Sequence, residues 1–159
     1  MDLMMSADYE KKLQALRSEI QAAQGNPFSI EQELTALLNE GGPNLAIDLL
    51  LSLSDAAHSG AMYALVHAAE SLDKNPYRSY ISAVLSILPQ MFETSPSWTL
   101  EVLRRIMNAD ASLCELVQQL RDAPAPIKET ARNICKLNDA ISPDYMLDTV
   151  KAQVARAAS

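Results

Sequence analysis

The chain has 159 residues, enough for one domain whose core forms without disulfides or bound metal. It is 48% hydrophobic but only 5% aromatic, which favours packed helices of Leu, Ile and Ala over a β-sheet. Its formal net charge of −7 disfavours nucleic acid as a partner, because phosphate groups would be repelled. We therefore predict one all-helical domain over residues 1–159. We expect it to lie in the cytoplasm and outside the membrane, because neither a secretory signal nor a long apolar run occurs.

The first part of the chain predicts three helices separated by glycine and proline. Apolar residues of the first recur at helical intervals: Tyr9, Leu13, Leu16 and Ile20. After Gly25-Asn26-Pro27, Ser29 and Gln32 form the capping-box pattern of a second helix. Its apolar positions are Ile30, Leu34, Leu37 and Leu38. Beyond Gly41-Gly42-Pro43, the segment 45–53 is apolar nearly all round, so we place it centrally in the core.

Two further helices are predicted in the middle of the chain. One runs from about residue 55 to 72 and ends before Asn75-Pro76. The next has the most regular apolar period, at Tyr77, Tyr80, Ile81, Val84, Leu85 and Leu88. Pro89 should interrupt it, because proline lacks the N–H group and its ring clashes with the preceding turn. Residues 91–92 are then expected in a short turn.

The remaining helices are predicted from their start signals. Ser95-Pro96 starts a helix with inward positions Trp98, Val102, Leu103, Ile106 and Met107. Ser112 and Glu115 form the capping box at the start of the next helix, which carries Leu113, Leu116, Val117 and Leu120. A helix with Ile127, Ala131, Ile134 and Leu137 follows the proline-containing segment 123–126. Ser142-Pro143-Asp144 caps the last helix, whose inward residues are Met146, Val150 and Val154.

These signals predict an all-α fold of about nine or ten helices joined by short connections. Short connections place consecutive helices antiparallel. Two architectures stay open: stacked helical hairpins, as in an α-solenoid of the HEAT or armadillo type, and an irregular helical bundle. No repeat at a fixed period decides between them.

The acidic residues are unevenly distributed along the chain. Residues 18–73 contain eight acids and no Lys or Arg, whereas three acids and three bases precede them and nine acids and ten bases follow. The eight are Glu19, Glu31, Glu33, Glu40, Asp48, Asp55, Glu70 and Asp73. Such a stretch is either a solvated acidic face or a docking surface for a basic partner. As partner-contacting candidates we name Glu31, Glu33, Glu40, Asp48, Asp55, His67, Glu70 and Asp73.

No arrangement of residues indicates catalysis or a cofactor. His67 and Glu70 lie one turn apart on a predicted helix, but a helical metal site needs ligands from a second helix. Cys114 and Cys135 fall in apolar patterns and are predicted to be buried free thiols. The four glycines are scattered, so no phosphate-binding loop is expected. We predict a protein that is not an enzyme and that holds no cofactor and no metal ion.

The sole tryptophan and two residues later in the same predicted helix have structural interpretations. Trp98 lies near the start of its helix and is expected to be a core residue. Arg105 lies toward the buried flank and is expected in a salt bridge or a helix-end contact. Asn108 is expected to end the helix.

The segments 61–71 (AMYALVHAAES) and 95–108 (SPSWTLEVLRRIMN) resemble the family called immunity protein thirty. These are bacterial proteins encoded beside secreted polymorphic toxins of contact-dependent inhibition systems. The resemblance covers roughly residues 45–120: a helix with Leu-Val-His-x-x-Glu, then a Trp-led helix that ends Arg-Ile-x-Asn. The residues that match by position are His67, Glu70, Trp98, Arg105 and Asn108.

The resemblance implies that the chain binds the C-terminal domain of a cognate toxin in the cytoplasm and blocks it. Many such toxins are nucleases with a basic substrate groove, which the acidic stretch would complement. The expected assembly is a monomer that forms a heterodimer with the toxin. The alternative is a helical-repeat adaptor that links proteins without inhibiting them.

Overall fold

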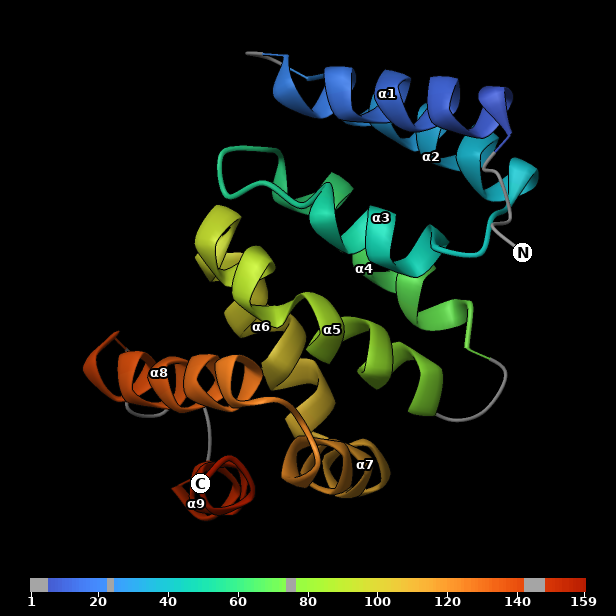
Figure 1. Ribbon diagram of the computed structural model, residues 1–159. Helices are drawn as coiled ribbons and strands as arrows, with labels where there is room; N and C mark the ends of the chain where they lie inside the picture. The colour runs from blue at the N-terminus through green and yellow to red at the C-terminus, as the bar shows by residue number, and fades with distance from the viewer. Residues whose placement is uncertain (1–5, 23–24, 74–76, 142–147) are drawn as a thin grey trace. The chain divides into compact units, whose positions relative to one another are not determined.

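The computed structural model describes residues 6–22, 25–73, 77–141 and 148–159, with side chains described outside 138–141 and 148–150. These residues form nine helices and no strand, which confirms the all-α prediction (Figure 1). The helices are α1 (Ala7–Gln21), α2 (Pro27–Glu40), α3 (Leu45–Leu51), α4 (Ser59–Ser71), α5 (Arg78–Thr94), α6 (Pro96–Met107), α7 (Asp110–Arg121), α8 (Ala125–Ile141) and α9 (Asp148–Ala157).

The chain divides into two compact units, Met1–Leu72 and Asp73–Ser159. We call them the N-terminal and the C-terminal unit. Each contains its own set of packed helices. That the whole chain is one domain stays a prediction.

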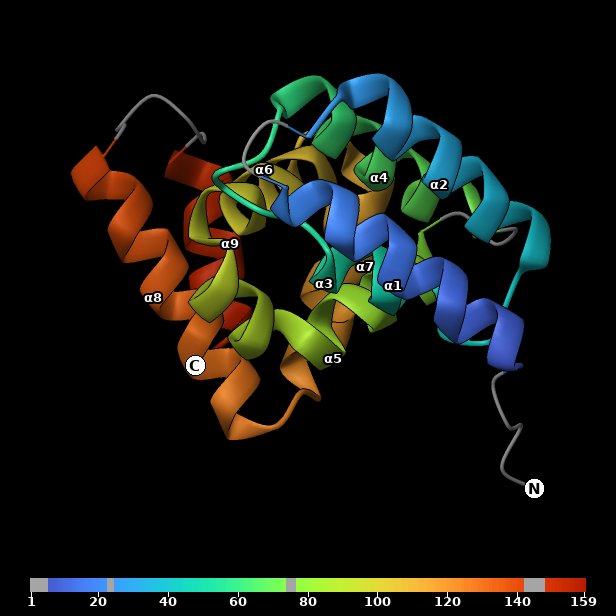
Figure 2. The same cartoon turned by 90° about the horizontal axis from the view of Figure 1, so that it is seen from above.

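The N-terminal unit consists of two helical hairpins, α1–α2 and α3–α4 (Figures 1 and 2). The helices of each hairpin pack together, and α2 also packs against α4. The apolar stripe predicted for α1 is confirmed, because all four of its members are buried: Tyr9, Leu13, Leu16 and Ile20. The other large side chains of this core come from all three remaining helices: Ile30, Leu37, Leu49, Leu50, Met62 and Leu65. Apolar burial of this extent holds the hairpins together.

Two helix starts in this unit differ from the prediction. α2 begins at Pro27, not after Ser29, because the Asn26 side chain accepts the backbone N–H of Phe28 at 3.0 Å. Asn26 and Pro27 thus form an N-cap and N1 pair three residues earlier than the Ser29 capping box. α4 begins at Ser59, and Asp55 lies in the preceding turn.

The C-terminal unit departs from sequential stacking. α5 contacts α6, α7 and α8, while α9 contacts α7 and α8. α5 is therefore the central helix of this unit, because the three helices that follow it in the sequence all pack against it. Arg132 of α8 donates a hydrogen bond to the Ala158 carbonyl, which ties α8 to the residue after α9. This arrangement is that of an irregular bundle, the second of the two predicted architectures.

Pro89 does not interrupt its helix, contrary to prediction. α5 continues through it to Thr94. Loss of the proline N–H costs a helix interior about 3 kcal/mol, but Met91 on the following turn is fully buried and contributes apolar packing. Tertiary packing therefore outweighs the local preference. Tyr77, predicted as the first inward residue, is instead exposed and left-handed at φ 71°, immediately before the helix.

Two further predictions for the later helices differ from the structure, and a third lies partly outside the described residues. Cys114 is exposed, and only Cys135 is buried. Ser112 is not an N-cap: α7 starts at Asp110, and the Ser112 hydroxyl donates to the Ile106 carbonyl at 2.5 Å. The predicted cap at residues 142–144 and the side chains of Met146 and Val150 lie outside the described residues, whereas Val154 is buried.

Candidate functional site

The outer side of α2 combines an aromatic residue with acids. Phe28 is 64% exposed, the largest exposure among the large apolar side chains of the described residues. Glu31, one turn later, is exposed, and Glu33 is half-buried. Ile30, Leu34 and Leu37 occupy the buried side of the helix, which places Phe28 off the apolar stripe. Phe28 was not among the residues predicted to contact a partner, although its position two residues before the buried Ile30 already placed it away from the buried stripe.

The outer side of α4 has a row of polar and aromatic side chains at helical spacing. Tyr63 and His67 are exposed, and their rings lie 6.5 Å apart. His67 Nδ1 lies 3.6 Å from Glu70 Oε2. The prediction that His67 and Glu70 share a face of one helix is therefore confirmed, and Tyr63 extends their row by one turn.

Because α2 packs against α4, these two outer sides belong to neighbouring helices. We call their side chains the α2–α4 surface; Phe28, Glu31, Tyr63, His67 and Glu70 lie on these outer sides, and the half-buried Glu33 lies on the other flank of α2. Neither helix contains Lys or Arg. The surface is therefore acidic, with two exposed aromatic rings, and it can contact a basic and partly apolar partner.

Glu40 at the end of α2 is bonded within the N-terminal unit. Lys12 Nζ of α1 lies 2.6 Å from Glu40 Oε2, and the Ser6 hydroxyl donates to Glu40 Oε1 at 3.2 Å. The hydrogen bond from Lys12 lowers the pKa of the Glu40 carboxyl below its ordinary value. This carboxylate thus stabilises the contact between α1 and α2.

Asp48 of α3 is half-buried and faces α1. The Tyr9 hydroxyl donates to Asp48 Oδ2 at 2.6 Å, and Arg17 lies 4.0 Å from Asp48 Oδ1. Arg17 also donates to the Ser52 hydroxyl at 3.1 Å. Burial, and then the hydrogen bond to Asp48, raise the pKa of Tyr9 well above its ordinary value. This network joins the two hairpins of the unit.

The other two candidate acids lie apart from the α2–α4 surface. Asp55 is exposed in the turn before α4. Asp73 belongs to the C-terminal unit, where its Oδ2 atom accepts the backbone N–H of Tyr80 at 2.9 Å. It satisfies a first-turn amide of α5, as capping carboxylates do. Which of the eight candidates contact a partner stays a prediction.

Three residues that match the family by position, Trp98, Arg105 and Asn108, lie in α6 or directly at its end. Trp98 is 8% exposed and belongs to the core, as predicted. Asn108 ends α6, and its backbone N–H donates to the Arg104 carbonyl. Arg105 is half-buried, and its neighbour Arg104 forms a two-point ion pair with the buried Glu101, at 2.6 and 2.9 Å.

No cluster of three or more metal-ligating side chains occurs among the residues whose positions are described. None of the described helices is long and apolar enough to cross a membrane. The features present are an all-helical fold, an acidic surface with exposed aromatic rings, and acids bonded to the basic side chains of α1. They define the class of an acidic all-helical protein with a candidate docking surface.

The family model described as Immunity protein 30 matches residues 10–116, which is more than half of the chain. The chain therefore belongs to the immunity protein 30 family. The matched segment includes α2, α4 and α6 and most of α1. No match was found among curated proteins, and none among solved structures.

Proposed function

We propose that this protein neutralises a cognate bacterial toxin in the cytoplasm by binding the toxin's C-terminal domain through the α2–α4 surface. Membership of an immunity protein family carries this proposal. The protein acts as an inhibitor without turnover, cofactor or metal, and it forms a heterodimer with the toxin. The favoured toxin is a nuclease with a basic substrate groove.

The charge of the N-terminal unit supports a basic partner. Residues 1–72 contain ten acids and three bases. All three bases, Lys11, Lys12 and Arg17, lie on α1, and two of them bond to Glu40 and to Asp48. Beyond α1, residues 22–72 contain six acids and no base, so this part of the unit is strongly acidic. At physiological salt such a field attracts a basic groove over a Debye length of about 8 Å.

The exposed rings of Phe28 and Tyr63 add apolar contact area to the acidic surface. Acids at an interface rim act mainly on the association rate, whereas buried aromatic anchors slow dissociation. Phe28 lies one turn before Glu31, so one partner groove can contact both. We infer that Phe28 enters an apolar recess of the toxin while Glu31 faces its basic residues, and that Glu33 adds to the negative field from the other flank of α2.

The test measures binding kinetics to the toxin domain encoded by the adjacent open reading frame, at low and at high salt. Replacing Glu31 and Glu33 by Lys should slow association at least about tenfold at low salt and less at high salt. The matched control reverses Glu93 and Glu129, two exposed acids of the C-terminal unit, and so changes the net charge by the same amount. If the association rates of both double variants fall by the same factor, net charge is responsible and the proposed surface is wrong.

A growth assay separates an inhibitor from the alternative adaptor. Co-expression of the chain with the toxin domain should restore growth, and Phe28→Ala with Glu31→Lys should reduce that rescue. An adaptor would bind a partner without restoring growth. A partner that binds the Glu31→Lys, Glu33→Lys variant at the parental rate at both salts would show that the acidic residues serve solvation.

A further inference from the structure

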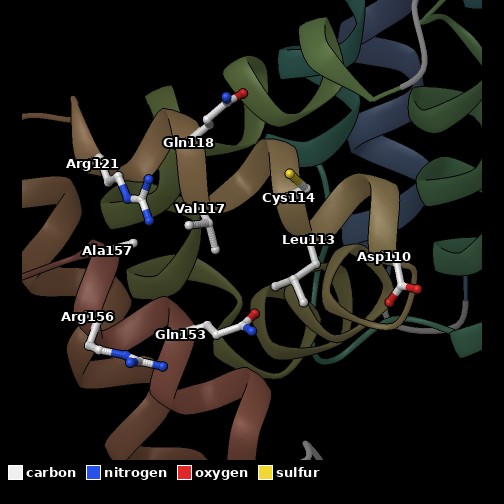
Figure 3. A pocket seen from close by; sticks show the side chains of 9 residues that line it. All are labelled: Asp110, Leu113, Cys114, Val117, Gln118, Arg121, Gln153, Arg156 and Ala157. Carbon is white, nitrogen blue, oxygen red and sulfur yellow. The ribbon is translucent and has the colours of Figure 1, made fainter.

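A cavity of about 650 Å³ lies between α7 and α9 of the C-terminal unit (Figure 3). Its size is within the range of about 300–1,000 Å³ typical of ligand sites. Both helices contribute to the walls, and both belong to the same unit. The lining residues are Asp110, Leu113, Cys114, Val117, Gln118, Arg121, Gln153, Arg156 and Ala157. We call this cavity the α7–α9 groove.

The middle of the groove is apolar on the α7 side. Leu113 and Val117, one turn apart, are half-buried and point from α7 toward α9 (Figure 3). Leu113 and Val117 were predicted as apolar positions of this helix, but among its apolar residues only Leu116 and Leu120 are fully buried. An apolar side chain placed between them would remove their remaining exposed surface from water, which favours binding by about 25 cal/mol per Å² buried.

The two ends of the groove carry opposite charge. Arg121 of α7 and Arg156 of α9 lie at one end, and Asp110 lies at the other (Figure 3). No hydrogen bond or ion pair joins the Arg121 guanidinium to a residue that the structure describes. Toward the described residues, the Arg156 side chain donates one long hydrogen bond of 3.4 Å, to the Ala152 carbonyl. Both side chains are exposed and keep most of their donors available for a carboxylate.

The arginines are also near the C-terminal ends of their helices, where a cation is favoured without any ligand. Each helix end contributes about half a negative charge, against one full positive charge on each guanidinium. This end of the groove therefore stays positive. It attracts an anion, and two guanidinium groups can bind its oxygens with more than one hydrogen bond.

The wall from α9 offers a polar group of another kind. The Gln153 side chain extends into the middle of the groove, opposite Leu113 and Val117 (Figure 3). An amide both donates and accepts, as the backbone of an extended peptide requires. A simple inorganic anion would use the arginines alone. A peptide would also use the apolar wall, the amide and Asp110.

We propose that the α7–α9 groove binds a short acidic and apolar peptide segment of a partner protein. Carboxylates of the segment lie at Arg121 and Arg156, apolar side chains lie against Leu113 and Val117, and the other end approaches Asp110. This surface goes beyond the proposed function, because it attracts acidic sequence whereas the α2–α4 surface attracts basic sequence. It gives the protein a second docking site.

The test uses the full chain without toxin, so its outcome is independent of the toxin-binding proposal. The probe is a fluorescent eight-residue peptide with one lysine at the start, two central leucines and two glutamates at the end. Fluorescence anisotropy should show saturable binding. Replacing both Arg121 and Arg156 by Glu should weaken it at least tenfold. The matched control replaces Arg78 and Lys136, two exposed bases outside the groove, by Glu and should bind like the parent.

A second measurement uses the exposed thiol at the groove. Cys114 lines the groove, whereas Cys135 is buried, so a maleimide reagent should modify Cys114 first. Saturating peptide should slow this reaction several-fold. Loss of binding in the control variant, full competition by phosphate or glutarate at the peptide's concentration, or unchanged Cys114 reactivity with bound peptide would each overturn the proposal.

Discussion

The two units of the chain have the same kind of core but different net charge, one acidic and the other neutral. Residues 1–72 contain ten acids and three bases, whereas residues 73–159 contain ten of each. The whole net charge of −7 is therefore that of the N-terminal unit. Both units bury Leu, Ile, Val and Met side chains, so packing does not require this difference. Because packing does not require this charge imbalance, the imbalance can serve to attract a partner protein.

The units also differ in how their acids are neutralised. In the C-terminal unit Glu101 pairs with Arg104 on the same helix, three residues away. In the N-terminal unit Glu40 and Asp48 pair with bases of α1, 28 and 31 residues earlier in the chain. α1 is thus the single source of positive charge for its unit. A fold that keeps its bases on one helix leaves the other helices acidic.

Core substitutions should have the largest effect on the free energy of unfolding. They also test whether the two units unfold together. Leu65 in the N-terminal unit and Leu85 in the C-terminal unit are 0% and 5% exposed. Each change to Ala should lower the free energy of unfolding by about 2–5 kcal/mol. Urea unfolding followed by Trp98 fluorescence and by circular dichroism measures it. In a single domain, Leu65→Ala shifts the Trp98 transition as much as the dichroism transition. An unshifted Trp98 transition would show two independent domains.

Removal of the Tyr9 hydroxyl should have an intermediate effect, confined to the contact between the two hairpins. Tyr9→Phe leaves the half-buried Asp48 without its 2.6 Å hydrogen bond and should cost about 1–2 kcal/mol of unfolding free energy. Arg17 and the core residues of α1 are unchanged in this variant. A cost close to zero would show that Arg17 alone satisfies the Asp48 carboxylate.

The same pair predicts a dependence on alkaline pH. The pKa of Tyr9 is raised in the folded protein, so the folded chain retains this proton at a pH where the unfolded chain loses it. The stabilising contribution is therefore fully present below the ordinary tyrosine pKa of about 10 and is lost as the pH rises beyond it. The difference in unfolding free energy between the parent and Tyr9→Phe should shrink between about pH 9 and 11. An unchanged difference would contradict this assignment.

The smallest effect is expected at the exposed pair of Lys12 and Glu40. Lys12→Gln should raise the pKa of the Glu40 carboxyl toward its ordinary value, because its main hydrogen-bond donor is lost. Carboxyl carbon NMR titration measures this pKa directly. Lys11→Gln, which removes the neighbouring exposed base, should leave it nearly unchanged. In the parent the lowered pKa adds stability above the ordinary pKa, and this is lost as the pH falls. Equal shifts in both variants would indicate general charge screening.

The sequence by itself determined the helices, most of their buried faces and the charge imbalance. The stripe of α1, the core position of Trp98 and the shared face of His67 and Glu70 follow from a repeat of 3.6 residues, which is a local property. The family was also readable from two short segments. The start of α2 was predicted at the wrong residue, since Asn26 and Ser29 are both of types that favour the N-cap position. The local sequence does not show which of the two is used.

Only the tertiary structure decided which acids are bonded within the fold and which face outward. Lys12 reaches Glu40, and Tyr9 reaches Asp48, because helix packing brings together residues 28 and 39 positions apart. Packing likewise carried α5 through Pro89 and left Cys114 exposed beside the α7–α9 groove. Periodicity gives the direction of a side chain around its own helix. What that side chain meets depends on the neighbouring helix, which local sequence does not specify.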